Sequence, residues 1–123
     1  MTDRPVLLLV EDEAMLRLLA TEMLEEAGFQ VFEAADGVEG LELLKNHPEI
    51  SLLVSDIKMP RMDGYALAEA GMALKPGLKI LLMTGYAQSP PPALLKQADV
   101  QILHKPFNLE LLCSLAAEMV EGA

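Results

Sequence analysis

The segment LLVSDIKMPRMDG, residues 52–64, sets a pattern that the rest of the chain repeats. Its apolar run ends on Ser55 and Asp56, and a Met-Pro step then breaks the chain before Asp63 opens the next periodic segment. This order predicts a buried strand that delivers the Asp56 carboxylate to its C-terminal end. Ligands of open parallel α/β sheets bind at that end of the strands. Asp56 is therefore the first candidate for a functional residue.

The chain on both sides of this segment alternates between short apolar runs and helical periodicity. The predicted strands span residues 6–10, 29–34, 52–56, 79–84 and 100–104. The predicted helices span residues 14–27, 38–46, 65–74 and 109–121, and Asn108 is the expected N-cap of the last one. A further helix should begin late, around residues 92–97, because the prolines at 90–92 lack N–H donors. This alternation predicts an α/β fold, a doubly wound parallel sheet with helices on both faces.

Length and composition narrow the class of protein. The 123 residues predict one domain, 1–123, whose core is built from aliphatic side chains and Met because the chain has only five aromatic residues. A formal charge of −10 argues against direct binding to nucleic acid or to anionic membranes. Cys113 is the single cysteine, so no intramolecular disulfide forms, and we expect a buried, inert thiol. No segment resembles a signal peptide or a membrane span, which predicts a cytoplasmic protein.

Polar residues follow four of the five predicted strands, and parallel strand ends meet at one edge of a sheet. These residues are Glu11 and Asp12, Ser55 and Asp56, Thr84, and His104 and Lys105. Clustered carboxylates raise one another's pKa unless a cation compensates, and oxygen-only ligands suit Mg²⁺. A carboxylate nucleophile beside a metal, a hydroxyl and an ammonium group is suited to phosphoryl transfer.

Taken together in this order, these motifs resemble the receiver domain of two-component response regulators over essentially the full chain. The motifs are Glu11-Asp12, Asp56 within SDIKMPRMDG, Thr84-Gly85 and Lys105-Pro106-Phe107. The resemblance implies a flavodoxin-like five-stranded sheet of order 2-1-3-4-5. It also implies that Asp56 is phosphorylated by a histidine kinase or a histidine phosphotransfer protein.

The resemblance further implies roles for the surrounding residues. Asp12, Asp56 and the backbone carbonyl of Lys58 would hold Mg²⁺, and Glu11 would act mainly through a metal-bound water. Thr84 and Lys105 would bind the phosphoryl oxygens and couple the chemistry to a conformational change. The domain would then be a signalling module that assists its own phosphorylation and dephosphorylation, not an enzyme. Its output would pass to a downstream protein, to a fused output domain or through a phosphorylation-dependent homodimer.

Two positions depart from the family pattern. Glu11 stands where Asp is commoner, which adds one methylene and shifts the expected metal-bound water. Ile102 stands where the family usually carries Tyr or Phe as a rotating switch. Tyr86, in the loop after Thr84, is a candidate replacement for that aromatic residue or else an ordinary surface residue.

Two other classes of protein fit the sequence less well, and several other polar residues have structural explanations. A phosphatase of the haloacid dehalogenase type would carry its nucleophile on the first strand with a second Asp two residues later, whereas Lys58 follows Asp56 at that spacing. A flavodoxin would need a Ser/Thr/Gly-rich phosphate loop after the first strand, and the chain has none there. Asp63 is expected to start a helix, and His47 and His104 are expected to be structural because neither has a partner at metal-ligand spacing.

Overall fold

A computed structural model of the protein describes residues 4–59, 61–84, 100–104 and 108–121. The strands are β1 (Val6–Val10), β2 (Gln30–Ala34), β3 (Leu52–Asp56), β4 (Lys79–Thr84) and β5 (Val100–His104). The helices of the described residues are α1 (Ala14–Glu26), α2 (Gly37–Asn46), α3 (Gly64–Leu74) and α5 (Leu109–Glu121). All strand pairs are parallel and the sheet order is β2-β1-β3-β4-β5, which confirms the predicted doubly wound fold.

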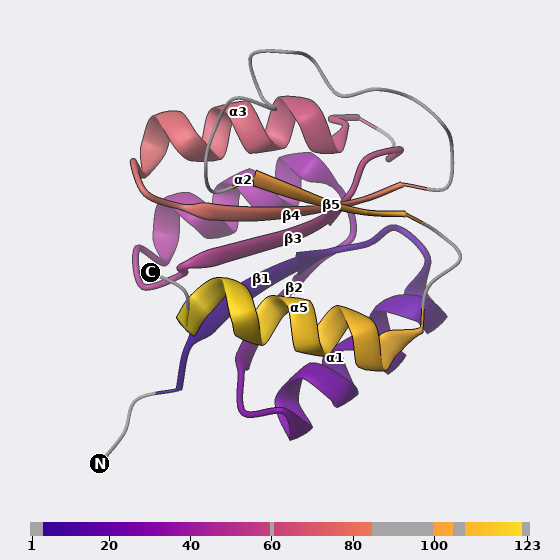
Figure 1. The fold of residues 1–123 in the computed structure, drawn as a ribbon. Helices are drawn as coiled ribbons and strands as arrows, with labels where there is room; N and C mark the ends of the chain where they lie inside the picture. Colours follow the sequence, from indigo (N-terminus) through magenta and orange to yellow (C-terminus); the bar gives the residue numbers. More distant parts are fainter. Residues whose placement is uncertain (1–3, 60, 85–99, 105–107, 122–123) are drawn as a thin grey trace.

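The sheet lies between two layers of helices (Figure 1). Helices α2 and α3 cover one face and α1 and α5 cover the other. The central strands β1, β3 and β4 each contain an unbroken apolar run because both of their faces are covered. Successive side chains of a strand point to opposite faces, so Leu8 and Leu53 pack toward α2 and α3, whereas Leu9 and Val54 pack toward α1 and α5.

Three helices begin at side chains that accept a hydrogen bond from the first turn. The Asp36 carboxylate accepts from the Glu39 N–H at 2.9 Å, and the Asp63 carboxylate accepts from the Ala66 N–H at 2.8 Å. The Asn108 side-chain oxygen accepts from the Leu111 N–H at 2.7 Å. The expected helix start at Asp63 and the expected N-cap at Asn108 are therefore confirmed. The predicted bounds of α1, β2, α2 and α3 are correct to within one residue.

A glycine inside α3 has a packing reason. A Cβ on Gly71 would lie 3.0 Å from a methyl carbon of Leu78 and 3.2 Å from one of Leu44. The glycine therefore allows α3 to approach α2 and the residue that precedes β4 closely. The additional helix predicted around residues 92–97 lies outside the described residues. None of the helices that the structure describes has the length and apolar character needed to span a bilayer.

Helix α1 has apolar residues on more of its surface than the sheet covers. Its buried residues are Ala20, Thr21 and Leu24. Met15 and Leu18 occur in the same helical pattern but remain exposed, at 64% and 51% of their surface. The periodicity predicted the helix, but which of its apolar side chains are buried depends on how the helix lies on the sheet.

Candidate functional site

Three carboxylates gather at the C-terminal edge of the two central strands. Glu11 and Asp12 directly follow β1, and Asp56 is the last residue of β3. These strands are neighbours, with Val10 paired to Ser55, so their next residues lie side by side. One carboxylate oxygen from each of the three acids lies within 4.8 Å of the others. The predicted convergence of these three carboxylates is present.

The environment of this cluster fits a divalent cation. Glu11 is 2% exposed and Asp56 is 7% exposed, whereas Asp12 faces solvent. Like charges at this spacing repel strongly where burial lowers the effective dielectric constant. A hard cation such as Mg²⁺ relieves this repulsion, takes carboxylate oxygens as ligands and keeps several waters, which the exposed side of Asp12 allows.

Backbone and side-chain contacts hold Glu11 in place. One of its carboxylate oxygens accepts a hydrogen bond from the Glu13 N–H at 3.0 Å. The Arg17 guanidinium donates to the Glu11 carbonyl at 2.7 Å and also pairs with Glu33 at 3.6 Å. The first turn of α1 therefore supports the acidic residues that precede it.

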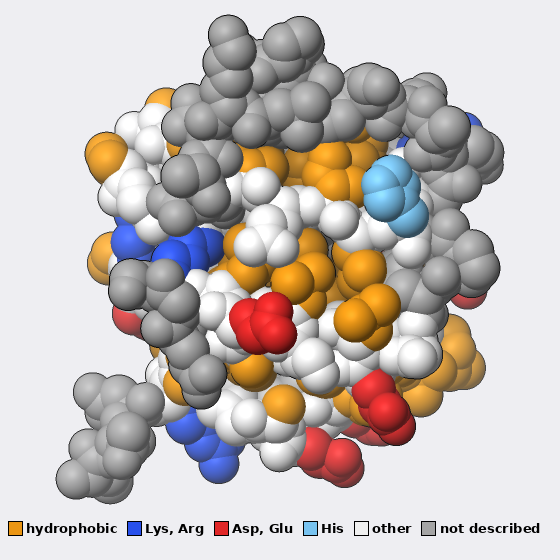
Figure 2. Space-filling model, viewed as in Figure 1, with side chains coloured by type: hydrophobic (Ala, Val, Ile, Leu, Met, Phe, Trp, Pro, Cys, Tyr) orange, Lys and Arg blue, Asp and Glu red, His pale blue; other side chains and the backbone are white. Residues whose placement is uncertain are grey.

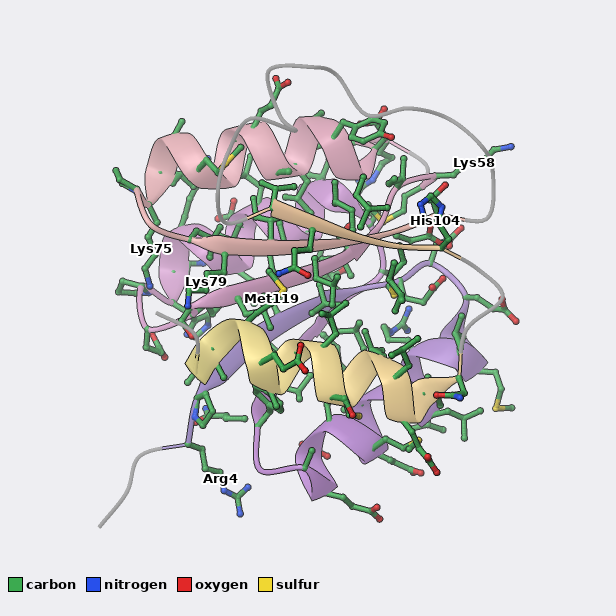
Figure 3. All side chains as sticks on the ribbon, in the orientation of Figure 1. Arg4, Lys58, Lys75, Lys79, His104 and Met119 are labelled. Carbon is green, nitrogen blue, oxygen red and sulfur yellow. The ribbon has the colours of Figure 1, made fainter. Side chains whose placement is uncertain are left out.

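Thr84 stands beside the acidic cluster at the end of β4. Asp56 pairs with Met83, and the Ile57 N–H donates to the Met83 carbonyl at 3.0 Å, so Thr84 is the next residue along this edge. The Thr84 side chain is buried. Lys58 is exposed as expected, and Figure 3 shows it at the same end of the molecule as His104. Lys105, Tyr86 and Phe107, which the sequence also singled out, lie outside the described residues.

The loop between β3 and α3 folds back closely on Asp56. The Gly64 N–H donates to the Ile57 carbonyl at 2.8 Å. A Cβ on Gly64 would lie 2.5 Å from the Asp56 carbonyl oxygen, so only glycine fits this approach without displacement. Ser55 adds a buried hydrogen bond from its hydroxyl to the same carbonyl at 2.8 Å. These contacts fix the backbone on which the Asp56 carboxylate stands.

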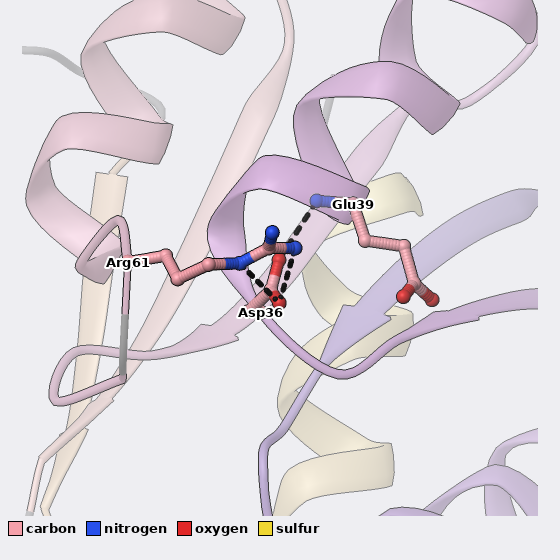
Figure 4. A network of polar contacts seen from close by, with 3 residues as sticks. All are labelled: Asp36, Glu39 and Arg61. Carbon is pink, nitrogen blue, oxygen red and sulfur yellow. Dashed lines mark hydrogen bonds and ion pairs between the residues drawn. The ribbon is translucent and has the colours of Figure 1, made fainter.

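An ion pair beside this loop was not identified from the sequence. The Arg61 guanidinium donates from Nε and Nη2 to one oxygen of Asp36, at 3.0 and 2.7 Å (Figure 4). The hydrogen bond from the Glu39 N–H, assisted by Arg61 and opposed by desolvation, lowers the pKa of Asp36 below its ordinary value of 3.8. The two partners are 25 positions apart, and no local pattern in the sequence indicates the pair.

The remaining candidates are His47, His104 and Cys113. His47 stacks on Phe32 with ring centroids 4.2 Å apart and lies 3.5 Å from a Glu49 oxygen. Among the described residues, the acidic trio is the only group of His, Cys, Asp and Glu placed to hold a metal, so neither His47 nor His104 joins one. Cys113 is half-buried rather than buried; desolvation, and to a smaller extent Glu26, raise the pKa of its thiol above 9.0.

Comparison with known proteins agrees with this geometry. The family profile of the response regulator receiver domain matches residues 7–117. The chain is 36% identical to the response regulator receiver protein CpdR of Brucella abortus, over 95% of this chain and 98% of that protein. It is 38% identical to part of the sensor kinase CckA of the same species, covering 93% of this chain but only 12% of the kinase.

A solved structure shares the whole architecture. The response regulator receiver protein of Sinorhizobium medicae superposes with a TM-score of 0.85 at 29% identity, covering 97% of this chain and 96% of that one. The sheet order, the acidic cluster at its edge and the profile match over residues 7–117 agree with one another. The chain therefore belongs to the response regulator receiver domains of two-component signalling systems.

Proposed function

We propose that Asp56 accepts a phosphoryl group from a phosphohistidine on a histidine kinase or a histidine phosphotransfer protein, in a reaction that requires Mg²⁺. The observation that carries this proposal is the position of Asp56, on a central strand and within 4.8 Å of two further carboxylates. The similarity to part of a sensor kinase and to a separate receiver protein supports a role in a phosphorelay.

Four residues would hold the cation. Asp12 and Asp56 would supply carboxylate oxygens, Lys58 would supply its backbone carbonyl, and Glu11 would act mainly through a bound water. Bound Mg²⁺ would neutralise charge on the transferring phosphoryl oxygens. Glu11 is longer by one methylene than the aspartate common at its position. Its hydrogen bond from the Glu13 N–H holds the longer side chain back toward its own loop, which supports the indirect role.

The transfer itself uses groups of this chain. A carboxylate oxygen of Asp56 attacks the phosphorus atom, the P–N bond of the phosphohistidine breaks, and its electron pair returns to the imidazole nitrogen. The Thr84 hydroxyl donates a hydrogen bond to a phosphoryl oxygen, and the Lys105 ammonium pairs with another. Because Asp56 is only 7% exposed, the donor must approach from the strand edge, where the acidic cluster opens to solvent at Asp12.

Helix α1 offers a docking surface for this donor. It begins two residues after Asp12 and exposes the apolar side chains of Met15, Leu18 and Leu19. A donor whose phosphohistidine reaches Asp56 would lie over this edge of the sheet, next to the first turn of α1. Figure 2 shows the face that carries β5 and α5, with hydrophobic side chains across its middle. The clearest Lys and Arg side chains of this view lie toward the left, whereas the C-terminal ends of the strands point to the right.

Intact-protein mass spectrometry after exposure to acetyl phosphate tests the chemistry. We expect the wild type to gain a single phosphoryl group with Mg²⁺ and none with EDTA, and Asp56→Asn to gain none under either condition. Glu49→Gln removes an exposed carboxylate elsewhere and is the matched control, which should react like the wild type. An adduct on Asp56→Asn, or one that forms in EDTA, would contradict the proposed site.

Phosphorylation should shift an equilibrium between two conformations. The added charge would draw Thr84 and Lys105 toward the phosphoryl group, and Tyr86 is the aromatic residue available to follow them. Ile102 is half-buried and packs against the core between the sheet and α2 and α3, so the sheet position of the usual switch is occupied by a packing residue. Output would then pass to a protein partner, to a fused domain or through a homodimer.

Hydrogen exchange with and without phosphorylation tests this switch. We expect altered exchange between residues 86 and 105 in the wild type. Lys105→Ala should remain folded and still accept the phosphoryl group, but should lose the altered exchange. Unchanged exchange in the phosphorylated wild type would argue against the switch, and loss of folding in Lys105→Ala would make that lysine structural.

A further inference from the structure

Arg61 adopts a backbone conformation that ordinarily favours glycine. Its φ of +69° lies in the left-handed region, and it is the only non-glycine residue among those described with a positive φ. A side chain in this region strains the backbone through contacts of its Cβ atom. The arginine side chain must therefore be held by contacts that offset this strain.

Those contacts are the two hydrogen bonds from Arg61 to Asp36. Exposed ion pairs usually contribute little to stability, and the Arg61 side chain is 60% exposed. Its partner differs from an ordinary surface carboxylate, since Asp36 is only 14% exposed and its other oxygen already accepts the Glu39 N–H at the start of α2. Asp36 is thus fixed before Arg61 binds it, which makes a two-donor contact more effective than a contact between two mobile side chains.

The ion pair joins two segments that flank the acidic cluster. Arg61 lies in the loop between β3 and α3, which also carries Lys58, and Asp36 lies between β2 and α2. The segments also touch through their backbones, because a Cβ on Gly37 would lie 2.4 Å from the Met62 carbonyl oxygen. The far end of the loop is held at Gly64 against the Asp56 carbonyl. The loop is therefore anchored after Lys58 by Arg61 and Gly64, and before it by Ile57, whose N–H donates to the Met83 carbonyl.

We propose that the Arg61–Asp36 pair is a positioning clamp, which holds the β3–α3 loop so that the Lys58 carbonyl faces the cation bound by the acidic cluster. This inference rests on the proposed function, since it takes the Lys58 carbonyl as a metal ligand. Arg61 itself does not touch the cation. Its effect is to reduce the number of loop conformations that metal binding would otherwise have to order.

The substitution Arg61→Gly separates the clamp from backbone strain. Glycine adopts a positive φ without strain, so the substitution relieves the backbone strain at this position. It also removes the side chain that contacts Asp36. We expect unchanged or increased resistance to urea but binding of Mg²⁺ or Mn²⁺ weakened about tenfold, as for outer-shell partners of metal ligands. Titration calorimetry with Mg²⁺ and electron paramagnetic resonance with Mn²⁺ measure this affinity independently of phosphorylation.

The change in net charge and the loss of the Arg61–Asp36 ion pair each need a separate control. Arg61→Gly makes the protein more negative by one charge, which by long-range attraction alone would tighten cation binding. Lys45→Gln makes the same change on an exposed residue of α2 and should leave affinity unchanged or slightly higher. Asp36→Asn should weaken metal binding as Arg61→Gly does. The double variant should bind the metal no more weakly than the weaker-binding single variant, because both substitutions remove the same contact.

The outcomes distinguish the clamp from the function on which it rests. If the wild type binds the metal and Arg61→Gly binds it within twofold of the same affinity, the clamp is wrong and the proposed phosphoacceptor site stands. If the effects of Arg61→Gly and Asp36→Asn add in the double variant, the two residues act separately and the clamp is again wrong. If the wild type binds neither Mg²⁺ nor Mn²⁺, both proposals fail.

Discussion

Substituting Gly64 by alanine places a methyl group against the backbone that carries the Asp56 carboxylate. The new Cβ would lie 2.5 Å from the Asp56 carbonyl oxygen and 2.8 Å from the Ile57 Cα, whereas ordinary contact begins at 3.4 Å. These are backbone atoms at the end of a central strand, and the Ile57 N–H is bonded to the Met83 carbonyl. They cannot rotate away as a side chain would. The helix start and the strand end must separate by about 0.9 Å, from 2.5 to 3.4 Å.

The cost of this separation follows from packing measurements on other proteins. Forcing an extra methyl group into a close-packed site typically costs about 1–3 kcal/mol. We expect Gly64→Ala to lie in the upper part of that range, about 2–3 kcal/mol of unfolding free energy, because the neighbours are backbone. The helix propensity gained from alanine, at most about 1 kcal/mol in a helix interior, is smaller at the first residue of α3.

Gly71→Ala is the matched control within the same helix. Its Cβ would approach only methyl carbons of Leu78 and Leu44, at 3.0 and 3.2 Å. Gly71 and Leu44 also line a cavity of about 200 Å³, which leaves room for a side chain to shift. Alanine in the middle of α3 gains about 1 kcal/mol of helix propensity, which offsets the tight contacts. We expect the unfolding free energy of this variant to change by less than about 1 kcal/mol.

Urea denaturation followed by far-ultraviolet circular dichroism measures both variants, and the chain has no tryptophan for a fluorescence probe. Phosphorylation by acetyl phosphate at a fixed Mg²⁺ concentration is the second readout. A displacement near 1 Å at a reacting group can lower a rate by about 10²-fold, so Gly64→Ala should also react more slowly. The reasoning is refuted if Gly64→Ala is as stable as Gly71→Ala and is phosphorylated at the wild-type rate.

Other features give further predictions. Leu53→Ala removes a fully buried side chain from β3 and should cost about 2–5 kcal/mol in urea denaturation; a loss below about 1 kcal/mol would contradict the packing described. Asp63→Ala removes the acceptor for the Ala66 N–H and should cost about 1 kcal/mol by the same assay, with Asp63→Asn retaining most of the stability. Burial and the neighbouring Glu26 raise the pKa of Cys113, so its thiol should react with a disulfide reagent at pH 8 more slowly than glutathione does, and faster as the pH rises. A rate equal to that of glutathione would mean that the thiol is exposed.

Several local features were correctly predicted because their signals lie within a few residues. The bounds of β1, β3, β4 and β5 agree with the predicted strands. In β1, β3 and β4 the signal is the apolar run of a strand covered on both faces, whereas β5 is an edge strand in which Gln101 is exposed. Asn108 was predicted as an N-cap because its side chain acts on the helix turn that immediately follows it. In α1, by contrast, the helical periodicity does not separate the exposed Met15 and Leu18 from the buried Leu24.

By itself, the sequence determined the alternation of strands and helices, and with it the placement of Glu11, Asp12 and Asp56 at one edge, because the ends of parallel strands converge there. Only the tertiary structure decided the contacts between segments distant in the chain. The pairing of Arg61 with Asp36, 25 positions away, is one example. Periodicity reports on neighbours within one element, whereas a contact between two loops depends on how the elements pack.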